Sequence, residues 1–277
     1  MSRETNINAF QDTCAKISTN EELQKSVFYS KQYMQVIPES KSINILSLET
    51  PKRGLIKVSN SRTFDAARTY ESGHTAVLNF ASATTAGGGV VKGAQAQEEC
   101  LCRCSTLYQI LSNKKCWDEF YKPHRDNLNP LHNDDIIWVP KCKVFKNDDL
   151  QLLPQNEWKD VSVITCAAPN LRQKNCDMFN IDKAIDYELS NDELYKIHLK
   201  RAIRIFTVAA QKKVDNIIVG AFGCGAFKND PTTVAKAWKE ASEAYKQFFD
   251  TIEFAVYDPM KFNVSWTNNY KIFSEII

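Results

Sequence analysis

The sequence lacks a strong net charge and any long run of apolar residues. Its 35 basic and 33 acidic side chains leave a formal net charge of +2. Such a balance gives no strong attraction to duplex nucleic acid or to an anionic membrane, so an anion site would have to be local. No apolar segment approaches the roughly 20 residues of a membrane-spanning helix. Because the first residues, MSRETNINAF, also lack the apolar core of a secretory signal, we expect an intracellular, cytoplasmic protein.

The nine cysteines lack the paired CxxC spacing of many zinc sites. Scattered cysteines in odd number are typical of reduced thiols, and we expect most of them to be core residues. Cys100, Cys102 and Cys104 lie in a segment with helical periodicity, where residues two apart point in different directions. We therefore predict no metal site. The four histidines have no common spacing, and we assign them no chemistry: His74, His124, His132 and His198.

The 277 residues suffice for one large domain or for a domain with an accessory lobe. Residues 1–70 have mostly helical patterns, with one extended piece at 43–48, and we interpret them as a lobe packed on the body. Residues 71–277 alternate β-rich runs with amphipathic helices, which predicts an α/β sandwich. The β-rich runs are TAVLNF (75–80), DIIWV (135–139), VSVITCA (161–167), NIIVGAF (216–222) and EFAVY (253–257).

Two amphipathic helices are predicted in the second half of the chain. Between Asp192 and Lys212 the apolar residues recur at helical spacing. Asp230 is a favourable N-cap and Pro231 suits a first helical position, so another helix is predicted to begin there. We assign the apolar stripes of both helices to the core.

Three consecutive glycines, Gly87, Gly88 and Gly89, follow the predicted strand at 75–80 and precede a predicted helix at about 95–112. Glycines without Cβ let the backbone approach a sugar or phosphate closely and point its N–H groups at oxygens. Glu98 and Glu99 come at the start of that helix, where acidic residues are favoured by the helix dipole in any case. A flexible surface loop with solvated glutamates is therefore the simpler alternative.

A second glycine-containing loop, VGAFGCGAFKNDP, also follows a strand and precedes a helix. Ligands of α/β proteins usually bind at the carboxyl ends of strands, so two such loops are suited to one ligand. Neither loop has a familiar nucleotide fingerprint. GGGVVKG lacks the ending of a Walker A loop, and GAFGCGAFK has Lys228 where a GxGxxG motif needs glycine.

The pattern of GGG, seven residues and QEE resembles the signature of poly(ADP-ribose) glycohydrolases. The segments LNFASATTAGGG, LCRCSTLY, ITCAAPNLR and VGAFGCGAF resemble the smaller, microbial type, in order from about residue 75 to 258. The resemblance implies a macrodomain-like three-layer α/β/α sandwich with a mixed sheet, plus a mainly helical N-terminal extension. It also implies hydrolysis of ribose–ribose O-glycosidic bonds, with release of ADP-ribose and without metal or cofactor.

Carried onto this sequence, the resemblance makes Glu99 the catalytic general acid and base. It implies that Glu98 binds hydroxyls of the terminal ribose and that Gln97 helps to hold the loop. A proton donor needs a raised pKa, which burial under a ligand provides and a helix N-terminus opposes. We expect the raised pKa of Glu99 only when substrate is bound.

The resemblance also assigns substrate-binding roles outside the QEE triplet. The glycine triplet and the second loop would contact the diphosphate, Phe227 the terminal ribose, and Tyr257 the adenine. The full set is Gly87, Gly88, Gly89, Gly223, Cys224, Gly225, Ala226, Phe227 and Tyr257, with Asn79 and Ser82 at the distal ribose.

Two alternatives stay open. A non-catalytic ADP-ribose-binding macrodomain would have no need for an acid, whereas a hydrolase of another ADP-ribosyl linkage, to protein or nucleic acid, would use the same acid. We expect the partner to be ADP-ribose or its polymer on modified proteins. We expect no membrane, no sequence-specific nucleic-acid binding and a monomer.

Overall fold

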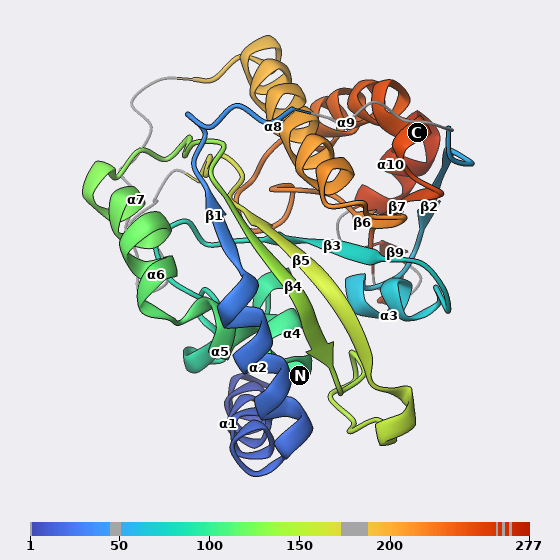
Figure 1. Ribbon diagram of the computed structural model, residues 1–277. Helices are drawn as coiled ribbons and strands as arrows, with labels where there is room; N and C mark the ends of the chain where they lie inside the picture. Colours follow the sequence, from blue (N-terminus) through green and yellow to red (C-terminus); the bar gives the residue numbers. More distant parts are fainter. Residues whose placement is uncertain (1, 45–50, 173–187, 259, 262–263, 266–267) are drawn as a thin grey trace. The chain divides into compact units, whose positions relative to one another are not determined.

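The computed structural model describes residues 2–44, 51–172, 188–258, 260–261, 264–265 and 268–277 (Figure 1). These residues fall into two compact units. The first contains residues 2–39 and 79–167, and the second contains 40–44, 51–78, 168–172 and the described residues from 188 onward. The expected division into 1–70 and 71–277 stays a prediction. Residues 45–48 of the predicted extended piece lie outside the described residues.

In the first unit, β1 (Gln35–Ile37), β4 (Ile136–Val144) and β5 (Lys159–Cys166) pair antiparallel. A bulge between Val139 and Cys142 shifts the register of β4 against β5. Such a bulge bends the strand and re-aims its residues. Lys141 lies in this bulge with a φ of 51°.

In the second unit, β3 (Thr75–Phe80), β6 (Asn216–Val219), β7 (Thr251–Ala255) and β2 (Leu55–Ser59) pair parallel. The last two residues of β3, from Asn79, belong to the first unit. The order of the strands is β1-β4-β5-β3-β6-β7-β2. The predicted α/β class with a mixed sheet is confirmed. A short antiparallel pair, β8 (Met260–Lys261) and β9 (Val264–Ser265), follows.

Helices of the first unit begin at side-chain caps in two clear cases. Ser2 caps α1 (Arg3–Thr19), and Asn20 caps α2 (Glu21–Tyr33), which lies beside α1 (Figure 1). The other helical segments are α4 (Gln97–Cys104), α5 (Leu107–Leu111), α6 (Lys114–Cys116), α7 (Lys122–Asn127), η1 (Val90–Lys92), η2 (Trp117–Tyr121) and η3 (Gln155–Glu157).

The single helix predicted at about 95–112 is interrupted. Ser105 has extended backbone and forms a β-bridge with Val144 between α4 and α5. The Thr106 N–H donates to the Lys143 carbonyl at 3.1 Å, in place of a helical bond. A pairing with a strand far away in sequence therefore overrides the local periodicity.

The second unit contains α3 (Thr63–Arg68), α8 (Asn191–Gln211), α9 (Pro231–Tyr245), η4 (Lys246–Phe248) and α10 (Asn269–Ile276). Both predicted helices are confirmed. Ser190 and Glu193 form a capping box at α8, and Asp230 caps α9 with Pro231 in its first turn. In the part of the chain that the structure describes, no helix is long and apolar enough to cross a membrane.

Candidate functional site

The glycine triplet forms a tight series of turns after β3. Gly87 and Gly88 have φ values of 66° and 55°, in the left-handed region that favours glycine. The Gly88 N–H donates to the Thr85 carbonyl at 3.0 Å, and the Val90 N–H donates to the Gly87 carbonyl at 3.1 Å. The loop is thus folded on itself, unlike the flexible surface loop considered from the sequence.

Glu98 and Glu99 lie in the first turn of α4 and are both buried, with 2% and 6% of their surfaces exposed. Glu98 accepts hydrogen bonds on both oxygens, from Asn79 Nδ2 at 3.1 Å and from the Ser82 N–H at 2.7 Å. Glu99 Oε1 accepts from the Gly89 N–H at 2.8 Å. Among the residues that the structure describes, the buried Glu99 Oε2 has no hydrogen-bond partner. The two carboxyls therefore differ in what remains available for a ligand.

Gly88 makes this arrangement possible. A Cβ at that position would overlap Glu99 Oε1 and lie 3.1 Å from Glu98 Oε2. At Gly87 a Cβ would lie 2.7 Å from the Tyr108 ring. The contacts with Glu99 Oε1 and with the Tyr108 ring are closer than real Cβ atoms tolerate. The absence of side chains at these positions brings the loop backbone against the two carboxyls.

Burial controls the protonation of both glutamates. It raises the pKa of Glu98 to about 8, against the hydrogen bond from the Ser82 N–H, and the neighbouring charge of Glu99 adds to the rise. Burial also raises the pKa of Glu99, although the Gly89 N–H and the Arg103 guanidinium oppose it. The expectation that the pKa of Glu99 rises only with bound substrate is therefore wrong, because the fold itself already removes the carboxyl from water.

Gln97 holds the start of α4 to the end of β3. Its Oε1 accepts a hydrogen bond from the Phe80 N–H at 2.9 Å. Asn79, Ser82, the glycine triplet and the QEE triplet all belong to the first unit. The structure thus brings together this half of the predicted site residues.

Several polar side chains that the sequence analysis missed hold the backbone around this site. Asn6 Nδ2, on α1, donates to the Gly93 carbonyl at 3.2 Å. Buried Arg103 donates to the Ala94 carbonyl at 2.6 Å, and Arg125, on α7, donates to the Thr84 carbonyl at 3.2 Å. Each bond fixes a carbonyl in or beside the loop from Thr84 to Ala94. No spacing in a single sequence marks such residues, because their partners are backbone atoms of distant segments.

The second predicted loop lies in the second unit, between β6 and α9. Gly223 has a φ of 79°, and a Cβ there would lie 2.7 Å from Ala168 Cβ. Gly225 and Ala226 are exposed, and a Cβ on Gly225 would meet nothing within 4 Å. The half-buried Phe227 has its ring 5.9 Å from the Arg172 guanidinium.

The other predicted residues of this unit differ in environment. Burial raises the pKa of the Cys224 thiol well above its usual range, so the thiol is neutral. Tyr257 is 47% exposed, and its ring lies 4.5 Å from the Arg62 guanidinium. The Tyr257 ring is thus about half exposed, with a cation over it.

A buried side chain, that of Asn229, holds the second loop, and nothing in the sequence indicates this role. Asn229 Nδ2 donates to three carbonyls, those of Pro169 at 2.7 Å, Gly223 at 3.1 Å and Phe227 at 3.2 Å. Its Oδ1 lies 2.8 Å from His198 Nε2, and the Trp238 indole N–H donates to His198 Nδ1 at 3.4 Å. Burial lowers the pKa of His198 to about 4, so the ring is neutral and donates from Nε2. We assigned His198 no chemistry from the sequence, and here it supports Asn229 through a hydrogen bond.

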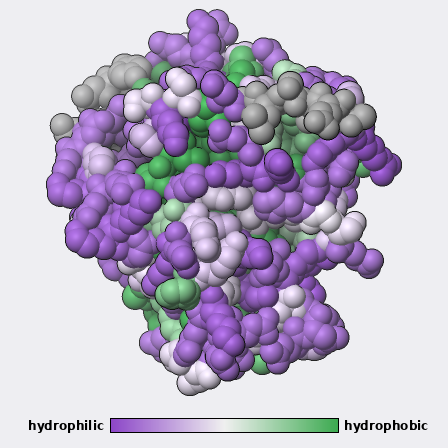
Figure 2. All heavy atoms as spheres, in the orientation of Figure 1, coloured by the Kyte–Doolittle hydropathy of each residue, from purple (hydrophilic) through white to green (hydrophobic). Residues whose placement is uncertain are grey.

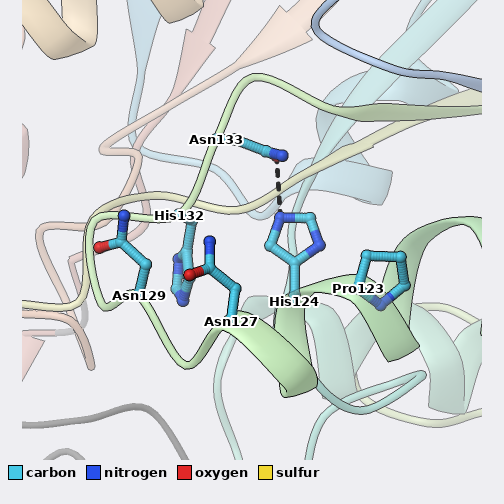
Figure 3. A pocket seen from close by; sticks show the side chains of 6 residues that line it. All are labelled: Pro123, His124, Asn127, Asn129, His132 and Asn133. Atoms are coloured by element: carbon cyan, nitrogen blue, oxygen red, sulfur yellow. Dashed lines mark hydrogen bonds between the residues drawn. The ribbon is translucent and has the colours of Figure 1, made fainter.

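A small cavity lies beside α7 in the first unit (Figure 3). Its volume is about 110 Å³, and it is lined by Pro123, His124, Asn127, Asn129, His132 and Asn133. Small-molecule sites usually measure about 300–1,000 Å³, so this cavity suits water-sized molecules rather than a nucleotide. His124 lies between the Phe120 carbonyl and Asn133 Oδ1, each at 2.8 Å from a ring nitrogen.

Among the described residues, no group of three or more His, Cys, Asp or Glu side chains could hold a metal ion. Cys102 and Cys104 are buried, and Cys100 is half-buried. Burial raises the pKa of all three thiols. They are packed as neutral core groups.

The mixed sheet and the buried carboxyl pair beside a glycine loop define an α/β protein with a candidate glycosidase site. The family model "Microbial-type PARG, catalytic domain" matches residues 5–147, more than half of the chain. The chain belongs to this family. No curated protein matches it.

Solved structures of bacterial enzymes are similar to the whole chain. Poly(ADP-ribose) glycohydrolase (PARG) from Thermomonospora curvata is 26% identical, with a TM-score of 0.82 over 99% of this chain and 100% of that one. The enzyme from Deinococcus radiodurans in complex with ADP-ribose is 28% identical, with a TM-score of 0.70 over 90% of this chain and 95% of that one. The Thermomonospora curvata enzyme bound to the inhibitor ADP-HPD is 24% identical, with a TM-score of 0.78 over 99% of this chain and 100% of that one, and supports the fold.

Proposed function

We propose that this chain is a poly(ADP-ribose) glycohydrolase with Glu99 as its general acid and base. The observation that carries the proposal is the buried Oε2 of Glu99, which has no hydrogen-bond partner in the described part of the chain, while Oε1 of the same carboxyl is bound to the glycine loop. Each oxygen of Glu98 already accepts one hydrogen bond that holds it in place, whereas Glu99 has an oxygen that accepts none from the described residues. Family membership and the ADP-ribose bound to the similar Deinococcus radiodurans enzyme support the substrate class.

In the proposed reaction, protonated Glu99 donates its proton to the oxygen of the leaving ribose. The bond between this oxygen and the anomeric carbon breaks, and the terminal ribose develops oxocarbenium character. Glu99, now a carboxylate, accepts a proton from water as the water oxygen bonds to the anomeric carbon. Free ADP-ribose and a polymer shortened by one unit leave, and Glu99 is protonated again.

Glu98 is proposed to bind the hydroxyls of the terminal ribose. Asn79 and Ser82, assigned to the distal ribose from the resemblance, hold Glu98 in the free protein, which supports a positioning role as well. Gln97 is proposed to fix the start of α4 through the Phe80 N–H. The N–H groups of the glycine triplet are suited to diphosphate and ribose oxygens.

The residues of the second unit are proposed to bind the remainder of ADP-ribose. Gly223, Cys224, Gly225 and Ala226 would contact the phosphates, and their exposure or small side chains support this role. Phe227 would contact the terminal ribose. Tyr257 would stack on adenine, which its exposed ring supports.

The test is replacement of Glu99 by Gln, which keeps the shape of the side chain and removes the acid. Loss of an essential general acid is expected to lower the rate by about 10²–10⁴-fold. Release of ADP-ribose from polymer is followed by product mass, and ADP-ribose binding by calorimetry. Glu157→Gln, at an exposed position of the same unit, is the matched control. Equal turnover by wild type and Glu99→Gln, with binding intact, would contradict the proposal.

Two alternatives are distinguished by the same assay. A buried carboxyl with a raised pKa favours catalysis over simple ADP-ribose binding, because a binding module gains nothing from a neutral acid. Hydrolysis of another ADP-ribosyl linkage would use the same residues. A panel of ADP-ribosylated proteins, nucleic acids and polymer, compared by product mass, identifies the leaving group.

We further propose a monomeric, cytoplasmic enzyme that acts on ADP-ribose polymers attached to modified proteins. Hydrophilic side chains cover most of the face shown in Figure 2, which supports a monomer. The cysteines described are all free thiols, which supports a reducing compartment. Light scattering gives the mass in solution, and fractionation of the cell gives the location.

A further inference from the structure

Helix α2 has a partly inverted distribution of side chains, because it buries serines and exposes aromatic residues although Leu23 and Val27 pack against the core. Its buried residues are Leu23, Ser26 and Ser30, whereas three aromatic residues face solvent. Phe28 is 72% exposed, Tyr33 51% and Tyr29 38%. A surface helix normally buries its apolar residues and exposes its polar ones, so large aromatic residues exposed together point to a binding surface.

The inverted orientation is fixed by the bulge in β4. Ser30 Oγ donates to the Pro140 carbonyl at 2.6 Å, and Ser26 Oγ donates to the Lys141 carbonyl at 3.0 Å. Leu23, one turn earlier, packs in a cluster with Ile17 and Phe145. These contacts leave Phe28 on the solvent side of α2, opposite the serines, while Tyr29 and Tyr33 flank the buried side, about 100° or more around the helix from Phe28.

The aromatic rings are arranged with a cation beside them. The Tyr29 and Tyr33 ring centroids are 4.6 Å apart at an angle of 45°. Lys141 Nζ lies 4.9 Å from the centre of the Tyr29 ring. We name Phe28, Tyr29, Tyr33, Lys31, Lys115 and Lys141 the α2 face.

The lysines of the α2 face form no ion pairs with carboxylates among the described residues. Within the described residues, none of Lys31, Lys115 and Lys141 forms an ion pair, whereas Lys25 pairs with Glu21 and Lys114 with Asp118. Burial raises the pKa of the Cys116 thiol to about 12, and the charge of Glu119 adds to the rise, whereas the charges of Lys115 and Lys31 oppose it. The α2 face therefore carries three lysines without ion pairs, with the charge of Glu119 near two of them, in a chain with a net charge of only +2.

We propose that the α2 face binds ADP-ribose units of the polymer other than the unit being released. Exposed aromatic rings stack on bases without sequence preference, and lysines attract phosphates. Each polymer unit carries both an adenine and a diphosphate, so its chemistry matches a face of rings and unpaired lysines. The proposal rests on the proposed function, because it takes the substrate to be the polymer.

The test compares long poly(ADP-ribose) with the ADP-ribose dimer as substrates. Phe28→Ser, Tyr29→Ser and Tyr33→Ser are combined in one variant, and Lys31→Glu and Lys115→Glu in another. Loss of the stacking rings is expected to raise KM for long polymer by about tenfold. KM and kcat for the dimer are expected to stay unchanged, because the dimer has too few units to occupy the face. In the lysine variant, KM for long polymer is expected to be higher than in wild type, and this KM is expected to depend less on the salt concentration.

Matched controls are Leu152→Ser, another exposed apolar residue of the first unit, and Lys271→Glu, an exposed lysine of the second. Neither should change KM for long polymer, and thermal melting checks that every variant folds.

An unchanged KM for long polymer in the aromatic variant would overturn the proposal, as would equal increases for polymer and dimer. If instead the wild-type protein is a homodimer in solution and the aromatic variant is a monomer, the α2 face is a contact between two copies of the chain. If the wild-type protein cleaves neither substrate, both the proposed function and the proposed role of the α2 face are contradicted.

Discussion

The loop at residues 87–89 and the loop at residues 223–227 each follow a strand and precede a helix, yet different chemistry holds them. The first is held by a carboxyl, because the Gly89 N–H donates to Glu99. The second is held by the neutral amide of Asn229, which donates to three carbonyls and is supported by neutral His198. In the first loop the supporting group is also the proposed catalyst, and in the second it is not.

Because of this difference, mutations at the first loop should mainly change turnover, and mutations at the second loop should mainly change stability. A change at the first loop moves the group that reacts, so it should affect turnover directly. A change at Asn229 in the second loop leaves the carboxyls untouched and removes buried hydrogen bonds, so it should affect stability first. Buried polar groups left without partners are costly, which makes the second loop sensitive in spite of its neutral chemistry.

The largest effect is expected for Gly88→Ala. The new Cβ would overlap Glu99 Oε1, and the φ of 55° disfavours any side chain there. Displacement of a catalytic group by about 1 Å can cost roughly 100-fold in rate, and we expect a loss of kcat/KM of at least that size. Gly225→Ala is the control, because its Cβ would meet nothing within 4 Å, and its unfolding midpoint should match wild type. Near-normal turnover by Gly88→Ala would show that the loop can move away from the carboxyl.

A smaller effect, on stability, is expected for Asn229→Ala. The change removes the two N–H donors that three carbonyls share, at about 1 kcal/mol per N–H, so the free energy of unfolding should fall by about 2 kcal/mol. Denaturant titration measures it. Asn156→Ala, at an exposed position, is the matched control and should be neutral. A neutral Asn229→Ala would mean that water replaces the amide.

The smallest net effect is expected for a change of pH between about 4.5 and 6.5, because contributions from the two units have opposite signs there and partly cancel. The pKa of His198 is lowered to about 4 from an ordinary value near 6.5, so its contribution to stability is complete above pH 6.5 and is lost as the pH falls. Between pH 6.5 and 5 this loss is about 2 kcal/mol. The pKa of Glu98 is raised to about 8 from 4.5, so its contribution is lost as the pH rises from 4.5 towards 8.

Two variants separate the opposing contributions. His198→Gln should remove the loss of stability on the acid side, and Glu98→Gln should flatten the loss between pH 4.5 and 8. The free energy of unfolding, measured by denaturant at several pH values, gives both slopes. A His198→Gln profile with the same acid slope as wild type would mean that other groups cause it.

Local patterns predicted most elements but not every boundary. The strand at 75–80 and the helix that begins at Pro231 were predicted from periodicity and capping residues, and both are present. The helix predicted at about 95–112 is divided, because Ser105 pairs with Val144, which lies 39 residues further along the chain. Asn229 and Asn6 were missed as supporting residues because their partners are backbone carbonyls, which have no sequence signature.

By itself the sequence determined that glycines without side chains precede two glutamates across a strand–loop–helix connection, because strand length, helix start and glycine spacing are local properties. Only the tertiary structure decided that both carboxyls are buried, that the pKa values of both rise without a ligand, and that Glu99 keeps one oxygen without a partner. It also decided that α2 buries serines and exposes aromatic rings. Burial depends on atoms brought together from distant parts of the chain, and the free energy of a charge depends on that burial.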